Sequence, residues 1–256
     1  MFYAYSAADA PQPEGRITVP PGRSLGGMAI GILVVEAWYP MVPGNVANAG
    51  TYDFPVMYKI VEEASIAKIM QGDPDMLVPI KKSAEDLVKQ GARAIVGACG
   101  SFANYQQGVA EAVDVPVYLS VMLQAPLIMQ GLKPDQKLGV VAASAAALTS
   151  RVFEQCHITD PSRLIITEAM GLPEFQALAR CQGGFDSRKL ERELVDLTGA
   201  FVREHPEIGA LLLQCSDLPP YAWAIQQATG RPVFDMNSLI DWVHYALVRK
   251  PYAGIV

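Results

Sequence analysis

The feature of this sequence that most constrains its fold is an internal repeat. With an offset of 116 residues, the segment Ala94–Met122 aligns without a gap on Ala210–Ser238. Cys99 then aligns with Cys215, and each cysteine follows an apolar run and precedes a polar turn and a helical stretch. Self-similarity at a fixed offset indicates repeated structural units. The chain is therefore predicted to consist of two related halves.

Short apolar runs alternate with helical stretches along the chain. The run Met28–Val35 is typical of a strand that is buried on both faces of a parallel sheet. Further strands are expected at 94–97, 115–119, 137–142, 164–167, 210–213 and 232–234, and a first helix is expected at 64–70. The alternation predicts an α/β fold: two pseudo-symmetric lobes, each a parallel sheet flanked by helices, with the active site in the cleft between them.

Composition excludes several classes of protein. Apolar residues make up 51% of the 256 residues and the net charge is −6, so a disordered chain is excluded. The absence of a Lys/Arg block argues against nucleic acid or a membrane surface as partner, and the apolar runs are too short to span a bilayer. No leader segment is recognisable at the N-terminus, so a cytoplasmic protein is expected.

Cofactor and metal sites are also poorly supported. The four cysteines form no Cys-x-x-Cys pair and have no histidine at ligand spacing, so neither a metal site nor a disulfide framework is expected. The glycine-rich stretch 22–27 precedes a strand, whereas a dinucleotide-binding fingerprint follows one. We therefore expect no cofactor.

The two aligned cysteines are the predicted catalytic residues. In two facing lobes, Cys99 and Cys215 would lie at equivalent strand ends on opposite walls of the cleft. One thiolate could then remove a proton from a carbon atom while the opposite thiol protonates the other face, which inverts that carbon without a cofactor. The alternative is that both are ordinary buried cysteines.

Residues around the cysteines are suited to binding an anion. Gly100 and Ser101 follow the first cysteine, and Ser216 and Asp217 follow the second, each pair entering a helical stretch. Backbone N–H groups at a helix N-terminus attract a carboxylate, although the serines and the aspartate could equally be N-caps. Asn45 belongs to a Pro/Gly/Asn loop after the first strand, where open α/β sheets bind ligands.

These motifs resemble the aspartate/glutamate racemase superfamily over residues 28–250. The resemblance rests on Gly97–Phe102, on Leu213–Pro220, on the first strand with its loop, and on Leu138–Ser144, which adds Ser144 to the predicted substrate-binding residues. It implies a small-molecule substrate with a carboxylate, no cofactor and a homodimer. It also implies a first lobe of residues 1–122 plus 236–256, with an N-terminal arm at 1–27, and a second lobe of residues 123–235.

Two departures from the family pattern leave the substrate open. Asp217 stands where the family has Glu or His, and Gly100-Ser101 stands where the amino-acid racemases have Asn-Thr. Lys59 and Arg151 are the cations that could bind a second substrate carboxylate, but neither is well placed in the sequence. A less acidic substrate, such as an amide or a hydantoin ring, therefore stays possible.

The predicted function is that of a cofactor-independent racemase or epimerase. Its two cysteines would invert a carbon next to a carboxylate or carbonyl of an amino acid or related small acid. One alternative is a maleate-type cis–trans isomerase in which one cysteine acts as a nucleophile. Another is a non-enzymatic protein that binds a small molecule in the same cleft.

Overall fold

Two four-stranded parallel sheets organise the chain into two α/β lobes. The computed structural model describes residues 25–252, and nearly all of the predicted N-terminal arm lies outside this range. The first sheet has the order β2-β1-β3-β4 and the second has the order β6-β5-β7-β8. The strands of the first sheet are β1 Ile30–Glu36, β2 Val56–Ser65, β3 Ala94–Gly97 and β4 Val117–Tyr118. Those of the second are β5 Lys137–Ala142, β6 Leu164–Glu168, β7 Ile208–Leu213 and β8 Val233–Phe234. The predicted two-lobe α/β fold is confirmed.

The two sheets share the register that the repeat predicts. In the first sheet Ile30 of β1 pairs with Ala94 of β3, and in the second Leu138 of β5 pairs with Ala210 of β7. Ala94 and Ala210 are also aligned at the offset of 116 residues. The strands β3 and β7 are therefore structurally equivalent, and so are the segments that follow them.

Helices cover both faces of the sheets. The first lobe contains α1 Ile66–Gln71, α2 Leu77–Gln90 and α3 Gln106–Ala110, and α4 Ala125–Gly131 follows in the connection between the sheets. The second contains α5 Ser150–Gln155, α6 Pro173–Ala179, α7 Ser187–Glu204 and α8 Ala222–Thr229. None of the helices in the described part of the chain is long and apolar enough to cross a membrane.

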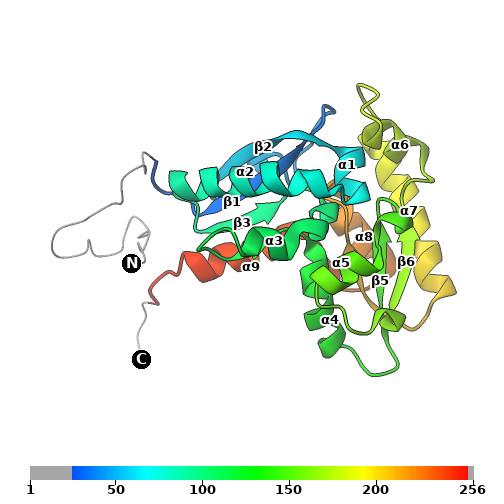
Figure 1. Ribbon diagram of the computed structural model, residues 1–256. Helices are drawn as coiled ribbons and strands as arrows, with labels where there is room; N and C mark the ends of the chain where they lie inside the picture. Colours follow the sequence, from blue (N-terminus) through cyan, green and yellow to red (C-terminus); the bar gives the residue numbers. More distant parts are fainter. Residues whose placement is uncertain (1–24, 253–256) are drawn as a thin grey trace.

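The last helix, α9 Met236–Leu247, returns from the second sheet to the first lobe (Figure 1). Its apolar side chains Ile240 and Val243 pack in one buried cluster with Ile30 and Val96 of the first sheet. The same cluster includes Val140 of the second sheet, so one core extends across both lobes. Burial of this shared apolar surface stabilises the relative position of the lobes.

The expected helix at 64–70 begins later than predicted, because the strand β2 occupies its first residues. The strand ends at Ser65, whose side chain then caps α1 by accepting a hydrogen bond from the N–H of Lys68 (3.4 Å). β2 is an edge strand, and its residues Glu62 and Glu63 are exposed. An edge strand with one solvated side shows no continuous apolar run, which is why the sequence pattern missed it.

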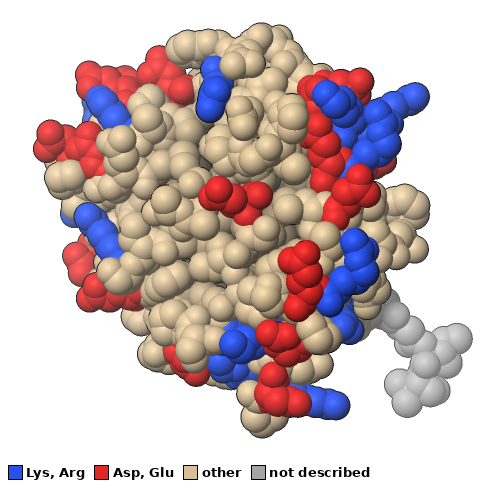
Figure 2. Space-filling view, turned by 90° about the vertical axis from the view of Figure 1, so that its right-hand side faces the viewer, with Lys and Arg blue, Asp and Glu red and all other residues tan. Residues whose placement is uncertain are grey.

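One face of the molecule shows how its charges are distributed. In Figure 2 the Lys and Arg side chains lie next to Asp and Glu side chains around the margin, and much of the centre carries neither, apart from acidic side-chain atoms near its middle. This face therefore presents mixed charge at its edge and a largely uncharged middle.

Candidate active site

The two aligned cysteines meet at one small cavity between the lobes. Cys99 is the second residue after β3 and Cys215 is the second residue after β7. Both line the same cavity, and both cysteine residues are half-buried. Because parallel strands of the two sheets end at this point, the fold brings together two residues that are far apart in the sequence.

Backbone contacts hold the lobes together beside the thiols. The Ser216 hydroxyl donates to the carbonyl of Ala98 (3.1 Å), and the N–H of Val46 donates to the carbonyl of Ser216 (3.4 Å). At Gly100 a Cβ atom would collide with the backbone carbonyl of Gln214 in the other lobe. Glycine is thus required here by close approach of two backbones. The structure shows the lobes closed on each other.

Asp217 is the central polar group of the cavity. Its Oδ1 accepts hydrogen bonds from the Tyr39 hydroxyl (2.8 Å) and from Asn45 Nδ2 (2.6 Å). Its Oδ2 accepts a hydrogen bond from Cys215 Sγ (3.4 Å). The first lobe therefore supplies two donors to the carboxylate of the second lobe, and the third donor is a candidate catalytic thiol.

Asn45 is held by its own loop rather than by the cavity. Its Oδ1 accepts the N–H of Ala47 (2.8 Å), and its carbonyl accepts the Thr51 hydroxyl (2.7 Å). These bonds are Asx-type and loop-type contacts that fix a short polar side chain in place. Because its Nδ2 donates a hydrogen bond to Asp217, Asn45 positions that carboxylate.

Burial and the mutual position of these groups shift their pKa values. Burial raises the pKa of Asp217, and the hydrogen bonds from Tyr39, Cys215 and Asn45 oppose that rise. Burial, followed by the neighbouring Asp217 charge, raises the pKa of Cys215 well above its ordinary value. Burial, again followed by Asp217, raises the pKa of Tyr39, which therefore stays a protonated donor.

Cys99 has different neighbours. Burial raises the pKa of its thiol to about 11, and the neighbouring backbone N–H and hydroxyl of Ser101 oppose this rise. The N–H of Phe102 donates to the carbonyl of Cys99 (3.0 Å). No carboxylate is hydrogen-bonded to Cys99 in the part of the chain that the structure describes. The two thiols are therefore equivalent in the fold but not in their surroundings.

Most of the remaining lining of the cavity is apolar, and Gln214 is the polar exception. Ile66 and Met70 of α1 line it from the first lobe, and Met170 with Phe175 and Ala179 of α6 line it from the second. We call these five residues the apolar wall. The free space is about 40 Å³, enough for a few water molecules.

The predicted site residues divide into three groups. Gly100, Ser101, Ser216 and Asp217 line the cavity with the two cysteines. Asn45 contacts it through Asp217. Ser144 does not line it, although the preceding residue Ala143 does.

Sequence reasoning missed Tyr39 and the apolar wall. Tyr39 follows the first strand closely, so the rule that ligands bind beyond strand ends could have identified it. The wall residues lie on two short helices and carry no pattern that separates them from core residues. Lys59 forms an ion pair with Asp86 (3.3 Å), and neither Lys59 nor Arg151 lines the cavity.

No group of three or more His, Cys, Asp and Glu side chains among residues 25–252 is arranged to hold a metal ion. The residues that line the cavity include two thiols and one carboxylate, and no cationic side chain is among those described. The chemistry available to this chain's own residues is therefore proton transfer and thiolate attack.

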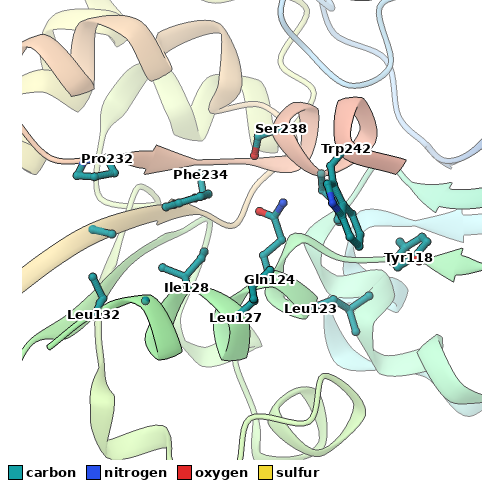
Figure 3. Close-up of a pocket in the computed structure, with 13 residues that line it drawn as sticks. Tyr118, Leu123, Gln124, Leu127, Ile128, Leu132, Pro232, Phe234, Ser238 and Trp242 are labelled. Carbon is teal, nitrogen blue, oxygen red and sulfur yellow. The ribbon is translucent and has the colours of Figure 1, made fainter. Parts of the chain in front are cut away.

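A larger cavity of about 540 Å³ lies elsewhere, between α4, β8 and α9 (Figure 3). Leu127, Phe234 and Trp242 are among its mostly apolar lining residues. It contains neither a thiol nor a carboxylate, so size alone does not locate the chemistry. The smaller cavity at the two cysteines is the candidate active site.

Comparison with solved structures identifies the fold. An allantoin racemase from Pseudomonas fluorescens superposes with a TM-score of 0.61 at 15% identity, over 88% of this chain and 99% of that one. Arylmalonate decarboxylase superposes with a TM-score of 0.57 at 20% identity, over 86% of this chain and 92% of that one. This chain has the aspartate/glutamate racemase fold. The resemblance inferred from the paired cysteine motifs is therefore confirmed at the level of the fold.

Curated relatives of this racemase-fold chain carry a different name. Dimethylsulfoniopropionate lyase 5 of Emiliania huxleyi (strain CCMP1516) is 28% identical over 238 residues, which cover 89% of this chain and 47% of that protein. Dimethylsulfoniopropionate lyase of Durusdinium sp. clade D is 25% identical over 245 residues, which cover 92% of this chain and 81% of that protein. The chain thus spans about half the length of the first of these relatives. No protein-family model matches it.

Proposed function

We propose that this chain is a cofactor-independent lyase that cleaves dimethylsulfoniopropionate into dimethyl sulfide and acrylate. The observation that carries the proposal is the hydrogen bond between the Cys215 thiol and Asp217, which has no counterpart at Cys99 among the described residues. The lyase names of the relatives that match most of this chain support the same activity.

The asymmetry of the two thiols favours elimination over inversion. Inverting a carbon needs a base on one face and an acid on the other, so both thiols must exchange protons. Eliminating a sulfonium group needs one base only, because dimethyl sulfide leaves as a neutral molecule and requires no proton. A single thiol with its own proton acceptor is suited to that simpler reaction.

The proposed reaction transfers two protons in turn and breaks one carbon–sulfur bond. The Cys215 thiol gives its proton to Asp217, and the resulting thiolate removes a proton from the carbon next to the substrate carboxylate. The electron pair of that C–H bond forms the new carbon–carbon double bond. The bond from the β-carbon to sulfur breaks, and its electron pair stays on sulfur. The products are acrylate and dimethyl sulfide. The thiol is protonated again, and Asp217 releases the proton that it accepted to water, which restores the starting state.

The raised pKa of Cys215 opposes formation of the thiolate, and two features of the site would offset this effect. Because burial raises the pKa of Asp217, the carboxylate is a better proton acceptor than an exposed aspartate. A substrate cation in the cavity would favour the thiolate, since opposite charges attract strongly away from bulk water. Backbone N–H groups after Cys99, where Gly100 and Ser101 line the cavity, are candidates for binding the substrate carboxylate.

A two-base racemase is the second candidate function. It is favoured by the presence of Cys99 and Cys215 at equivalent strand ends on the same cavity. The maleate-type isomerase and the non-enzymatic binding protein are weaker proposals, because neither accounts for the pairing of a thiol with a carboxylate. A small carboxylate substrate, a homodimer, a cytoplasmic location and the absence of a cofactor stay predictions.

One assay separates these candidates. Purified protein is incubated in D₂O with dimethylsulfoniopropionate, and separately with single enantiomers of amino acids and hydantoins and with maleate. Release of dimethyl sulfide, measured in the headspace, with acrylate in solution supports the lyase. Exchange of the α-proton with loss of optical rotation supports the racemase, and a covalent adduct with maleate, detected by intact mass, supports the isomerase. Folded protein that releases no dimethyl sulfide contradicts our proposal.

A further inference from the structure

The apolar wall faces the thiols from both lobes and is the part of the site that the proton-transfer chemistry does not use. Met70 belongs to α1 of the first lobe, whereas Met170 precedes α6 and Phe175 belongs to it in the second. Phe175 is 1% exposed, so its position is fixed by packing. A wall assembled from both lobes is complete only when the lobes are closed.

We infer that the apolar wall is the leaving-group pocket, which selects a fully methylated cation over an ammonium ion. The inference rests on the proposed function for the identity of the sulfonium group. Tyr39, Asn45 and Cys215 are hydrogen-bonded to Asp217, and the apolar wall contributes no polar side chain to the same cavity. A substrate whose α-carbon lies at Cys215 would therefore direct its distal end toward the wall.

The chemistry of the wall suits a cation that cannot donate hydrogen bonds. A dimethylsulfonio group has no N–H or O–H, so burying it leaves no donor unsatisfied. An ammonium ion in the same place would lose its water without gaining acceptors, which is strongly unfavourable. An aromatic ring and methionine sulfur atoms are polarizable neighbours that attract a methylated cation.

The wall also favours the reaction itself. The sulfonium charge disappears as the carbon–sulfur bond breaks, so the transition state carries less positive charge on sulfur than the substrate does. An apolar surround destabilises the full charge more than the partial one and accommodates the neutral sulfide well. The pocket would therefore contribute to the rate as well as to selectivity.

Binding measurements test the inference independently of turnover. The Cys215→Ser protein, which lacks the proposed base, is titrated calorimetrically with 3-(trimethylammonio)propionate and with 3-ammoniopropionate. The two ligands differ only in methylation of the cation. We expect the methylated ligand to bind at least 10-fold more tightly.

Two substitutions in the wall and one matched control are then compared in the same background. Phe175→Leu keeps an apolar side chain but removes the aromatic face, and we expect it to lower the affinity for the methylated ligand about 2- to 30-fold. Met70→Gln introduces an amide, and we expect it to reduce the preference for the methylated ligand by about 10-fold. Phe201→Leu alters another buried phenylalanine in the core of the second lobe, away from the cavity, and should leave the preference unchanged.

The outcomes separate this inference from the proposed function. Equal binding of the two ligands, or equal weakening of both by Phe175→Leu, overturns the leaving-group pocket even if dimethyl sulfide is released. A preference for the methylated cation that Phe175→Leu and Met70→Gln reduce and Phe201→Leu does not supports the pocket, even if the lyase assay fails.

Discussion

The surroundings of Cys99 and Cys215 differ although the fold makes the two residues equivalent. The offset of 116 residues that aligns the cysteines also aligns Ser101 with Asp217. In the first lobe the residue two positions after the cysteine is a serine, which opposes the rise in the pKa of that cysteine. In the second lobe it is an aspartate, whose carboxylate accepts a hydrogen bond from the thiol. One lobe therefore offers donors to its cysteine and the other offers a proton acceptor.

This difference shows how a pseudo-symmetric fold can host one-sided chemistry. Strand order and register determine where both sulfur atoms lie, and these features are shared by the two lobes. Whether one thiol or both can act as a base depends instead on the individual side chains beside each sulfur atom. Fold and mechanism are thus controlled at different levels of the structure.

The largest expected effect comes from removing each thiol in turn. Cys215→Ser should lower kcat for elimination by about 10³-fold or more, because a hydroxyl is a far weaker base than a thiolate at neutral pH. Cys99→Ser should lower it by about 10-fold or less. Headspace measurement of dimethyl sulfide gives both values. Equal losses of kcat in the two variants would contradict the proposed difference between the thiols and would favour the two-base racemase.

Replacing the carboxylate beside Cys215 should give the next largest effect. Asp217→Asn removes the proton acceptor, and we expect kcat at pH 7 to fall by about 10²-fold. The negative charge of Asp217 helps to raise the pKa of Cys215, so its removal should lower the pKa of this thiol. Alkylation of Cys215 by iodoacetamide, followed by mass spectrometry, should therefore begin at lower pH. Faster elimination by Asp217→Asn would show that the carboxylate only hinders ionisation.

A substitution at the contact between the lobes should have a smaller effect. In Gly100→Ala the added Cβ would collide with the carbonyl of Gln214, so the lobes could not close fully. We expect about a 10-fold loss in kcat/KM and a loss of stability of about 1–3 kcal/mol, measured by urea unfolding. Gly171→Ala is the matched control, because a Cβ there meets no atom within 4 Å. Similar losses in both variants would argue against close approach as the cause.

Removing a hydrogen-bond donor that the first lobe supplies to Asp217 should lower kcat by a smaller factor. Tyr39→Phe removes one hydrogen bond to Asp217 and leaves the bonds from Asn45 and Cys215. We expect kcat to decrease by about 3- to 10-fold, because the loss of one hydrogen bond to a charged group is partly compensated by the two bonds that are left. The pH at which activity changes should shift upward, since the Tyr39 bond lowers the pKa of Asp217. An unchanged pH profile would place Tyr39 outside the proton path.

The smallest expected effect concerns stability and pH. Burial raises the pKa of Asp217, so the folded state holds this proton to higher pH than the unfolded state does. The stabilising contribution is present at low pH and is lost as pH rises from the ordinary aspartate range through the raised folded value. Asp217→Asn should therefore raise Tm at pH 7 by about 2–4 °C, and less at pH 4. A lower Tm at pH 7 would indicate that the charged carboxylate stabilises the fold.

The sequence allowed much of this arrangement to be predicted. The repeat placed Cys99 opposite Cys215, and the apolar runs located the central strands because those strands are buried on both faces. The edge strand β2 was missed because its solvated side interrupts the apolar pattern. The apolar wall was missed because a methionine or phenylalanine in a cavity has the same sequence signal as one in a core. Only the spatial approach of α1 and α6 distinguishes them.

The small volume of the cavity affects how readily its two thiols are oxidised. Its free space of about 40 Å³ admits a few water molecules but excludes larger reagents unless the lobes separate. Oxidation of cysteine depends on both ionisation and access, and in the closed state both are restricted, since the pKa of each thiol is raised. The resting protein should therefore tolerate oxidants well, and its cysteines should be most vulnerable during the open interval of each catalytic cycle.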